Sequence, residues 1–359
     1  MIDKINIKGY KSIKDLSIEL SSINILIGSN GVGKSNFISF FKFLNILYEQ
    51  RLEQYSLKYG ADDLLFFGRR VTSTLMSQVT FDHTSEYAFI LEPTVDNKLF
   101  VNSEFAYFFN GNSESEWNKE NINTNSKEIN IISNKTPVAK YINFYLQSFK
   151  VYHFHDTSEN AALRIPSDIN DNHYLRENGS NLPAFLYYLK QKHEPNFNRI
   201  EKAVQSIAPF FERFNLEPQR LNEQRILLEW TEKSHPDKYF NATHLSDGTL
   251  RFIALATLLL QPNPPETIII DEPELGLHPV AINKLAGLIR SAAGKKRQVI
   301  ISTQSVNLVN NFEPEEIITV DRKGDESIFI RLDSAKLKQW LEEYSIGDLW
   351  SKSIINGQP

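Results

Sequence analysis

The stretch GSNGVGKSN, residues 28–36, constrains the fold of this chain more than any other part of the sequence. It satisfies the pattern G-x-x-x-x-G-K-[ST] through Gly28, Gly33, Lys34 and Ser35, and it lies between the apolar runs INILI and FISFFKFL. A strand, a glycine-rich turn and a helix in this order bring backbone N–H groups and a helix N-terminus around phosphate groups. We therefore predict a phosphate-binding loop in which Lys34 reaches the β and γ phosphates of a nucleotide and Ser35 places its hydroxyl on Mg²⁺.

A second group of candidate residues ends an aliphatic run in the last third of the chain. Residues 267–270, TIII, lead directly into Asp271 and Glu272, which are followed by Pro273. A buried strand that ends in two carboxylates suits a magnesium–nucleotide site. We expect Asp271 to hold the metal shell through water, and Glu272 to orient and polarise the attacking water as the general base.

The segment HLSDGTLRFIALATLLL, which begins at His244, predicts a helix with an anion site at its start. Ser246 is placed to cap this helix, so that its hydroxyl and the neighbouring N–H groups can bind a phosphate. Taken alone, the same residues are an ordinary helix N-cap. Their place shortly before Asp271, in a chain that also has a phosphate-binding loop, favours the functional interpretation.

The remaining sequence predicts an α/β chain with an antiparallel sheet and an inserted lobe. Short apolar runs over residues 1–28 predict strands, and strand-like runs recur between residues 61 and 109. Apolar spacing is helical over residues 182–214 without sustained heptads, and the final third alternates strands and helices. We divide the chain into an N-terminal lobe with the phosphate loop and the antiparallel sheet (1–109), a polar, Asn-rich surface excursion or mobile hairpin (110–136), a helical or mixed insert lobe (137–240) and a C-terminal lobe (241–359).

The composition excludes several classes of protein. Lys and Arg total 39 against 44 Asp and Glu, so the net charge of −5 gives no overall attraction to nucleic acid, although a local basic patch stays open. The chain has no cysteine, which excludes disulfides, cysteine nucleophiles and thiolate metal sites. The longest apolar runs fall short of the roughly 20 residues of a membrane span, and the N-terminus lacks an apolar signal core. We expect a soluble, cytoplasmic protein.

Four segments in this order, GSNGVGKSN, LSDGT, IIIDEPELGLHP and IISTQS, resemble the P-loop, signature, Walker B with D-loop, and switch of ABC ATPases in the SMC/RecF/OLD branch. More narrowly, GADDLLFFG, VYHFHDTSE, YLRENGSNL and YSIGDLWSKSIINGQP resemble segments of stand-alone bacterial ATPases of the AAA-21 type, which lack a nuclease domain. The resemblance covers nearly the whole chain apart from the Asn-rich stretch. It implies an α/β fold, an ABC/SMC-head-like P-loop ATPase with a mixed central sheet, an antiparallel β subdomain and an inserted helical lobe.

The resemblance also assigns site residues, motif by motif. It implies that Lys11 and Ser12 of GYKSI lie near the nucleotide, that Ser246 and Gly248 form the signature, and that residues 275–278 form a D-loop at a dimer interface. The implied ATP contacts within the loop are Gly28, Asn30, Gly31, Gly33, Lys34, Ser35 and Asn36. The implied catalytic residues are Glu272, Lys34 and Gln304, and the implied Mg²⁺ ligands are Ser35 and Asp271.

Two positions depart from the family pattern, and one family motif has no clear match. Asp247 replaces the first glycine of the Leu-Ser-Gly-Gly signature. The switch histidine of the family aligns with Gln304, and an amide side chain can hydrogen-bond an oxygen or a water but cannot carry a proton at neutral pH. We therefore expect hydrolysis to be slow or to wait for a partner. The family's Q-loop glutamine has no obvious match, and Gln78 is the candidate we name.

The segment HFHD, residues 153–156, leaves three interpretations open. On a strand, His153 and His155 point to the same side. They are then structural side chains with satisfied hydrogen bonds, contacts for a second subunit or partner, or a pair of metal ligands. No third cluster of obvious spacing supplies further ligands, so the structural interpretation is favoured.

Together the motifs predict an ATP-gated clamp, a homodimer or higher oligomer in which each γ-phosphate lies between one copy's P-loop and the other's Ser246 helix. Its target stays open. The clamp regulates a separately encoded effector, such as a nuclease-like protein in bacterial anti-phage defence or a toxin system; alternatively it is a RecF-like ATPase that binds DNA in repair or, least favoured, a transporter's nucleotide-binding subunit. Only 55 residues follow Gln304, too few for an appended nuclease domain, and LWSKSII near the C-terminus resembles a segment that docks on a partner.

Overall fold

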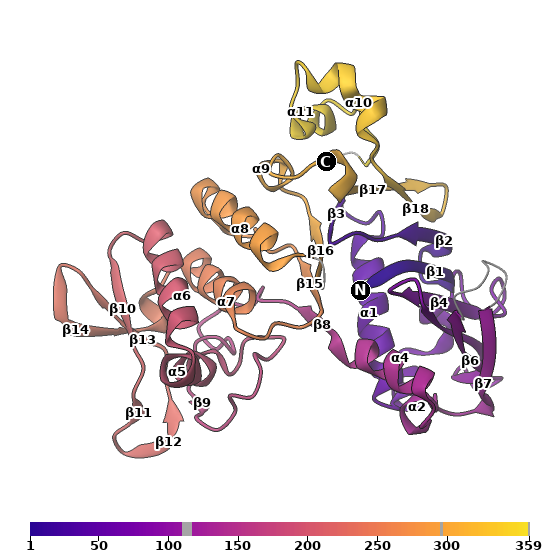
Figure 1. The fold of residues 1–359 in the computed structure, drawn as a ribbon, viewed down its shortest axis with the longest axis horizontal. Helices are drawn as coiled ribbons and strands as arrows, with labels where there is room; N and C mark the ends of the chain where they lie inside the picture. The colour runs from indigo at the N-terminus through magenta and orange to yellow at the C-terminus, as the bar shows by residue number, and fades with distance from the viewer. Residues whose placement is uncertain (110–116, 295–296, 358–359) are drawn as a thin grey trace.

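Two six-stranded sheets form the frame of the computed structural model, which describes residues 1–109, 117–294 and 297–357 (Figure 1). The first sheet is antiparallel throughout, with the strand order β2-β1-β4-β5-β6-β7. Buried and less buried residues alternate along β5, as expected for a sheet with one face on the core. The strands are β1 (Ile2–Tyr10), β2 (Ile13–Glu19), β4 (Leu75–Phe81), β5 (Ser85–Pro93), β6 (Leu99–Phe109) and β7 (Trp117–Ser126).

The second sheet is mixed and has the order β18-β17-β3-β16-β15-β8. All neighbouring strands run parallel except β18, which is antiparallel to β17. Its central strands are nearly continuous runs of buried aliphatic residues, because both faces of the sheet are covered. The strands are β3 (Ile23–Ile27), β8 (Phe149–Tyr152), β15 (Thr267–Asp271), β16 (Gln298–Thr303), β17 (Ile317–Lys323) and β18 (Glu326–Arg331).

The mixed sheet separates two hydrophobic cores. On one face Leu26 and Ile300 pack with the aromatic side chains of α1 (Lys34–Tyr48) and with the antiparallel sheet. On the other face Ile25 and Ile301 pack with α7 (Asp247–Leu260) and α8 (Pro279–Ala292). Because successive side chains along β3 and β16 point to opposite faces of the sheet, each strand contributes residues to both cores. Helix α1 lies between the two sheets (Figure 1).

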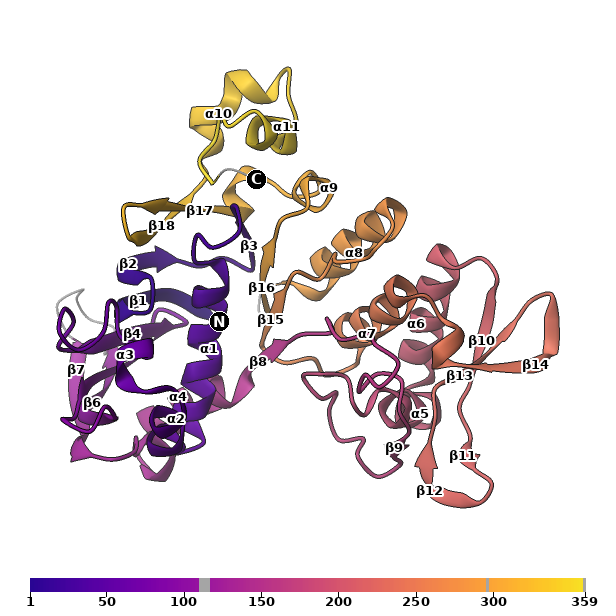
Figure 2. The ribbon, with the colours of Figure 1, turned by 180° about the vertical axis from the view of Figure 1, so that it is seen from behind.

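The insert lobe lies on the far side of the mixed sheet from the antiparallel sheet, as Figure 2 shows from behind. In it α5 (Leu182–Lys192) packs on α6 (Glu194–Ile207), and α6 packs on α7. Two three-stranded sheets, β10-β13-β14 and β11-β12-β9, extend from these helices. Their strands are β9 (Ser167–Asp168), β10 (Phe211–Asn215), β11 (Pro218–Gln219), β12 (Asn222–Ile226), β13 (Glu229–Glu232) and β14 (His235–Asn241).

The lengths of the helices bear on two expectations, one about a long coiled-coil arm and one about a membrane span. The helices of the insert lobe that precede the signature, α5 and α6, have 11 and 14 residues, so the described part of this lobe contains no long coiled-coil arm. The longest helix in the described ranges, α1, has 15 residues, and none there is both long and apolar enough to cross a bilayer.

The insert lobe begins later than the predicted residue 137. Residues 137–148 form α4 (Pro137–Ser148), which packs on α1 and on β5 and β6 of the antiparallel sheet, and β8 is the edge strand of the mixed sheet beside β15. The apolar side chains of Ile142 and Phe149 complete the core around α1. That boundary is therefore wrong, and the chain crosses to the insert lobe only after Tyr152.

The polar stretch predicted as a surface excursion or mobile hairpin contains a regular strand. Residues 110–116 lie outside the described residues, but residues 117–126 form β7, which pairs with β6 as one arm of a hairpin. A polar sequence suits this position because β7 is the edge strand of the sheet. The ammonium of Lys119 lies 3.6 Å from the ring centroid of Phe105. A turn of 3₁₀ helix, Ile131–Ser133, then leads toward α4.

The helical spacing predicted through residue 214 ends at Ile207. Pro209 has no N–H to continue the helical ladder, and residues 211–215 form β10 instead. The ring of Phe211 stacks on that of Trp230 in the neighbouring β13, with centroids 6.0 Å apart. The aromatic packing of this small sheet therefore overrides the local helical pattern.

The C-terminal segment docks on its own chain. After β18 the chain forms α10 (Ser334–Leu341) and α11 (Ile346–Ser351), and α11 packs on α9 (Val306–Val309). Leu349 and Trp350, which belong to the segment LWSKSII, are 0% exposed and lie in the core with Leu308. The indole N–H of Trp350 donates to the carbonyl of Gly357. The prediction that this segment docks on a partner is wrong for Leu349 and Trp350, because these two side chains fill the protein's own core.

Candidate nucleotide site

The predicted residues of the P-loop, the Walker B segment and the switch gather at the carboxyl ends of three neighbouring parallel strands. The P-loop follows β3, Asp271 ends β15, and Gln304 follows β16, which lies between them. Loops that leave parallel strands at their carboxyl ends share one edge of the sheet, which is the usual ligand-binding edge of α/β folds. Three segments that are distant in the sequence therefore form one site.

The P-loop packs too closely against the mixed sheet for any residue but glycine at two positions. Gly33 has a φ of +116°, and a Cβ there would lie 2.0 Å from the Oγ of Ser327. A Cβ on Gly28 would lie 2.2 Å from the carbonyl oxygen of Val320. Helix α1 begins at the next residue, Lys34, so its free N–H groups lie at the loop.

Lys34 is the buried cation of the site. Its Nζ donates to the carbonyls of Gly28 and Ser29, the latter at 2.9 Å. Burial lowers the pKa of Lys34, and the nearby carboxylates of Glu272 and Asp271 act in the opposite direction. An ammonium that is partly stripped of water and held at the mouth of a phosphate loop interacts strongly with phosphate oxygens.

The turn that carries Lys11 and Ser12 is fastened to the first turns of α1. The Oγ of Ser12 accepts from Nδ2 of Asn36 at 2.7 Å, and Nζ of Lys11 donates to the Oγ of Ser39 at 3.0 Å. Lys11 has a φ of +46°, in the left-handed region. Ser35 is exposed in the same turn of α1, where its hydroxyl is open to a ligand. The structure thus brings this turn and the P-loop together.

Gln304 connects the catalytic candidates across the site. Its Nε2 donates to Oε1 of Glu272 and to Oδ1 of Asn30, the latter at 2.7 Å. Glu272 has a φ of +41°, a left-handed conformation that is unfavourable for a residue with a Cβ and that is often found at functional sites. Ser302 of β16 binds both carboxylate residues: its carbonyl accepts from the N–H of Glu272 at 2.9 Å, and its hydroxyl donates to Oδ1 of Asp271.

Sequence reasoning missed Glu274, which lies under the switch segment. Its Oε1 accepts from the hydroxyl of Thr303 at 2.5 Å and from the N–H of Gln304 at 3.1 Å. The other oxygen, Oε2, is buried without a hydrogen-bond partner. Burial raises the pKa of this carboxyl. The available signal was its place in DEPE, two residues after Glu272.

We expect E274Q to be more stable than the wild type by about 1 kcal/mol at pH 8, and by less at pH 5. The folded-state pKa of Glu274 is raised, so its ionised form destabilises the fold at high pH, and this penalty is relieved as the pH falls toward the unfolded-state value. Gln keeps the acceptor for Thr303 and Gln304 without the charge. Urea unfolding at both pH values measures the difference, with E274A, which loses both hydrogen bonds, as the destabilised control. A lower stability of E274Q at pH 8 would contradict the expectation.

The HFHD segment lies beside the Walker B strand, which the sequence did not reveal. Nε2 of His155 is 2.7 Å from the carbonyl oxygen of Asp271. Arg251 of α7 donates to the carbonyls of Phe154 and His155, at 2.9 Å each. The segment therefore links the signature helix to the carboxylate end of β15. Nδ1 of His153 is buried without a hydrogen-bond partner, and within the described ranges no group of three or more His, Asp or Glu side chains is arranged to hold a metal ion.

The Q-loop candidate Gln78 does not join the site. It lies on β4 of the antiparallel sheet, and its Nε2 donates to Oε2 of Glu86. Its neighbours along the strand, Val79 and Phe81, face the core that contains α1, so the Gln78 side chain points to the opposite face. HFHD, and not the segment around Gln78, lies beside Asp271, where it connects the edge strand β8 to the insert lobe.

The signature turn caps its own helix and packs on the D-loop. The Oγ of Ser246 caps α7 by accepting from the N–H of Thr249 at 3.2 Å, and Ser246 is exposed. Gly248 packs on the D-loop, since a Cβ there would lie 2.4 Å from the carbonyl oxygen of Gly276. Among the described residues no hydrogen bond joins this turn to residues 28–36. The exposed hydroxyl is open to a ligand held by another molecule.

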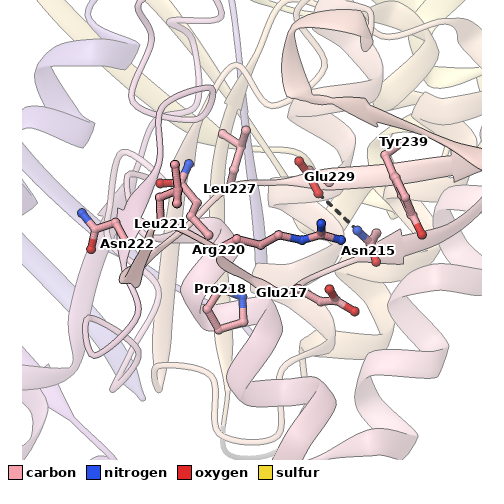
Figure 3. Close-up of a pocket in the computed structure, with 10 residues that line it drawn as sticks. Asn215, Glu217, Pro218, Arg220, Leu221, Asn222, Leu227, Glu229 and Tyr239 are labelled. Carbon is pink, nitrogen blue, oxygen red and sulfur yellow. Dashed lines mark hydrogen bonds between the residues drawn. The ribbon is translucent and has the colours of Figure 1, made fainter.

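A separate pocket lies in the insert lobe beside the β11–β12 hairpin (Figure 3). The Arg220 side chain extends between Glu217 and Glu229 toward Asn215, and Nδ2 of Asn215 donates to Oε2 of Glu229 at 3.1 Å. Leu221 at the hairpin tip is fully exposed. The lining shares no residue with the nucleotide site, so this pocket takes no direct part in chemistry at the P-loop.

The fold and the site define a P-loop ATPase with the head architecture of ABC and SMC proteins. Solved SMC heads match it along nearly the whole chain. The SMC head bound to the C-winged helix domain of ScpA has a TM-score of 0.62 and 18% identity, covering 93% of this chain and 99% of that chain. The SMC head with an extended coiled coil, bound to the C-terminal domain of ScpA from Pyrococcus furiosus, has a TM-score of 0.59 and 16% identity, covering 95% and 98%. The predicted α/β fold is confirmed.

The chain belongs to the AAA_21 family, described as "AAA domain, putative AbiEii toxin, Type IV TA system", whose profile matches residues 23–310. The resemblance to ABC/SMC-like ATPases and to the AAA-21 type is thereby confirmed. The energy-coupling factor transporter ATP-binding protein EcfA of Methanocaldococcus jannaschii is 36% identical over 80 residues. That match covers 22% of this chain and spans only 28% of the length of EcfA, so it concerns one segment.

Proposed function

We propose that this chain is a magnesium-dependent ATPase that dimerises head to tail around ATP and thereby regulates a separately encoded effector. The observation that supports the dimer best is the exposed Ser246 turn, which no hydrogen bond of the described residues joins to the P-loop. A nucleotide held by the P-loop alone keeps one side of its γ-phosphate open. Because each copy carries both a P-loop and a signature turn, two copies complete two sites by one symmetric interaction.

The residues at the sheet edge fit a triphosphate with Mg²⁺. Lys34, Asp271 and Glu272 lie close enough for the two carboxylates to act on the pKa of the lysine, so cation and metal-binding groups share one site. Ser35 and Asp271 would hold the Mg²⁺, which when bound neutralises charge on the phosphates. Lys34 binds the phosphate oxygens. Glu272, oriented by Gln304, accepts the proton of the water that attacks the γ-phosphorus, and the bond to ADP breaks.

Hydrolysis in turn sets the lifetime of the dimer. ATP stabilises the closed pair because its γ-phosphate contacts both copies, and this contact exists only in the closed state. Loss of the γ-phosphate removes the shared contact, and the two copies separate. Sedimentation of the purified chain with ATP, with ADP and without nucleotide tests the proposal; an oligomeric state that is identical in all three conditions would overturn it.

Gln304 is expected to keep basal turnover low. It orients Glu272 but cannot exchange a proton, whereas a histidine at this position can donate to the reacting phosphate and share a proton with the carboxylate. We expect Q304H to raise the hydrolysis rate by roughly tenfold and Q304A to lower it by roughly tenfold. Phosphate release measures both rates, and ATP affinity is the control that stays unchanged. Wild-type rates in both variants would show that Gln304 has no part in the reaction.

The effector is inferred from the family, whose description names a toxin of a type IV system. In this proposal the closed and open dimers present different surfaces to a protein encoded nearby. Purification from the native operon, with ATP and then with ADP, tests this: a neighbour-encoded protein that is retained in only one nucleotide state supports the proposal. Tight binding of DNA by the purified chain alone, with a steep salt dependence, would instead support the RecF-like alternative.

A further inference from the structure

A buried arginine lies directly under the signature turn. Arg164 has a side chain that is 7% exposed, and its Nη2 donates to Oδ1 of Asp247 at 2.7 Å. Its Nη1 donates to the carbonyls of Ala242 and Leu245, the latter at 3.4 Å, and its Nε donates to the carbonyl of Thr157 at 2.8 Å. One guanidinium thus holds the backbone that leads into the turn and the carboxylate within it.

The partner carboxylate belongs to the residue at which the signature departs from its family. Asp247 stands where Leu-Ser-Gly-Gly has a glycine, next to Ser246, and its side chain is 63% exposed. A carboxylate in the first turn of a helix offsets the positive end of the helix dipole, which otherwise attracts anions. An unpaired Asp247 would therefore repel a phosphate group that approaches Ser246.

We propose, in an inference that rests on the proposed dimer, that Arg164 is a positioning residue for the ATP held by the partner copy. It neutralises Asp247 and fixes the Ser246 turn in the shape that receives the γ-phosphate held by the other copy. Arg164 does not contact the phosphate itself, because its Nε, Nη1 and Nη2 groups are all engaged within the chain and the side chain is buried. Arginine suits this task because its planar fork serves several acceptors at once and stays charged when buried.

The charge argument makes a specific prediction for a pair of substitutions. R164M removes the positive charge but keeps an apolar side chain of similar length, and it leaves Asp247 facing the incoming phosphate. D247G restores the glycine of the family signature and removes the negative charge. If Arg164 acts by neutralising Asp247, the second substitution compensates the first. A purely structural role for Arg164 gives no such compensation.

The experiment measures ATP-dependent dimerisation by sedimentation in an E272Q background, so that ATP is not consumed. We expect R164M to weaken the dimer at least about tenfold, the R164M/D247G double variant to recover most of this loss, and D247G alone to change it less than about threefold. The defect of R164M should shrink at high salt, which screens the repulsion. ATP affinity of the monomer should stay unchanged in all variants, because the P-loop is intact.

Two results would overturn this inference and leave the proposed function standing: an R164M dimer as tight as that of its E272Q parent, or an R164M/D247G dimer as weak as that of R164M. Should R164M fail to fold, R164K in the E272Q background takes its place, because lysine keeps the positive charge. Its comparison is D247E in the same background, in which the longer side chain brings the carboxylate closer to the phosphate. We expect R164K to dimerise more tightly than D247E, and equal affinities would overturn the inference. If the E272Q parent itself does not dimerise with ATP, the proposed function fails together with the inference.

Discussion

E272Q is expected to hydrolyse ATP about a hundred to ten thousand times more slowly than the wild type and to accumulate as a stable dimer in ATP. The amide of Gln has the shape of the carboxylate but cannot accept a proton from the attacking water. The left-handed backbone at residue 272 is retained by Gln as readily as by Glu, so the site keeps its form. Phosphate release measures the first effect, and size-exclusion chromatography with light scattering measures the second.

Two controls separate trapping from simple aggregation. E272Q in ADP should be monomeric, because ADP lacks the γ-phosphate that both copies contact in the proposed dimer. The double variant K34A/E272Q should be monomeric in ATP, because Lys34 is the buried cation of the site and the group that we propose binds the phosphates. An E272Q dimer fraction that ATP does not change would exclude the clamp, whatever the effect on turnover.

The fold and the P-loop could be predicted because short contiguous segments of the sequence indicate both of them. The glycine-rich turn between INILI and FISFFKFL specifies strand, loop and helix by itself, and the aliphatic run before Asp271 specifies a buried strand. The boundary at residue 137 was wrong for a related reason. An amphipathic helix such as α4 has the same pattern whichever lobe it covers, and only its partners in the folded chain, α1 and the antiparallel sheet, decide where it belongs.

Contacts between distant residues could not be predicted in this way. His155 and Asp271 are 116 residues apart in the sequence, and Arg164 and Asp247 are 83 apart, yet each pair forms a hydrogen bond at the site. The sequence shows that HFHD and the Asp of LSDGT are unusual, but periodicity carries no information on which segments meet. For the same reason Gln78 was chosen as the Q-loop candidate, although it lies on the outer face of another sheet.

Mixing two inactive variants should restore activity if the sites are shared. K34A removes the phosphate-binding lysine, and S246R fills the exposed signature turn with a large side chain, so each homodimer has two broken sites. In a heterodimer, the P-loop of the S246R copy meets the signature turn of the K34A copy, and that one site is intact. In this proposal neither variant shares an ATP with a second copy of itself, so the dimers that form in ATP are mixed; with one working site of two, activity should recover to at most about half of the wild-type value.

The recovered activity separates shared sites from sites made within one chain. If Ser246 acted on the nucleotide of its own copy, no pairing could repair either variant, and the mixture would stay inactive at every ratio. H244R is the matched control, because His244 is exposed two residues before Ser246 but lies outside the cap of α7, and this variant should keep the wild-type rate. A fully active S246R homodimer would likewise show that the turn does not meet ATP. The recovery should follow the product of the two concentrations when the variants are diluted together, because the working species forms only when one copy of each meets the other.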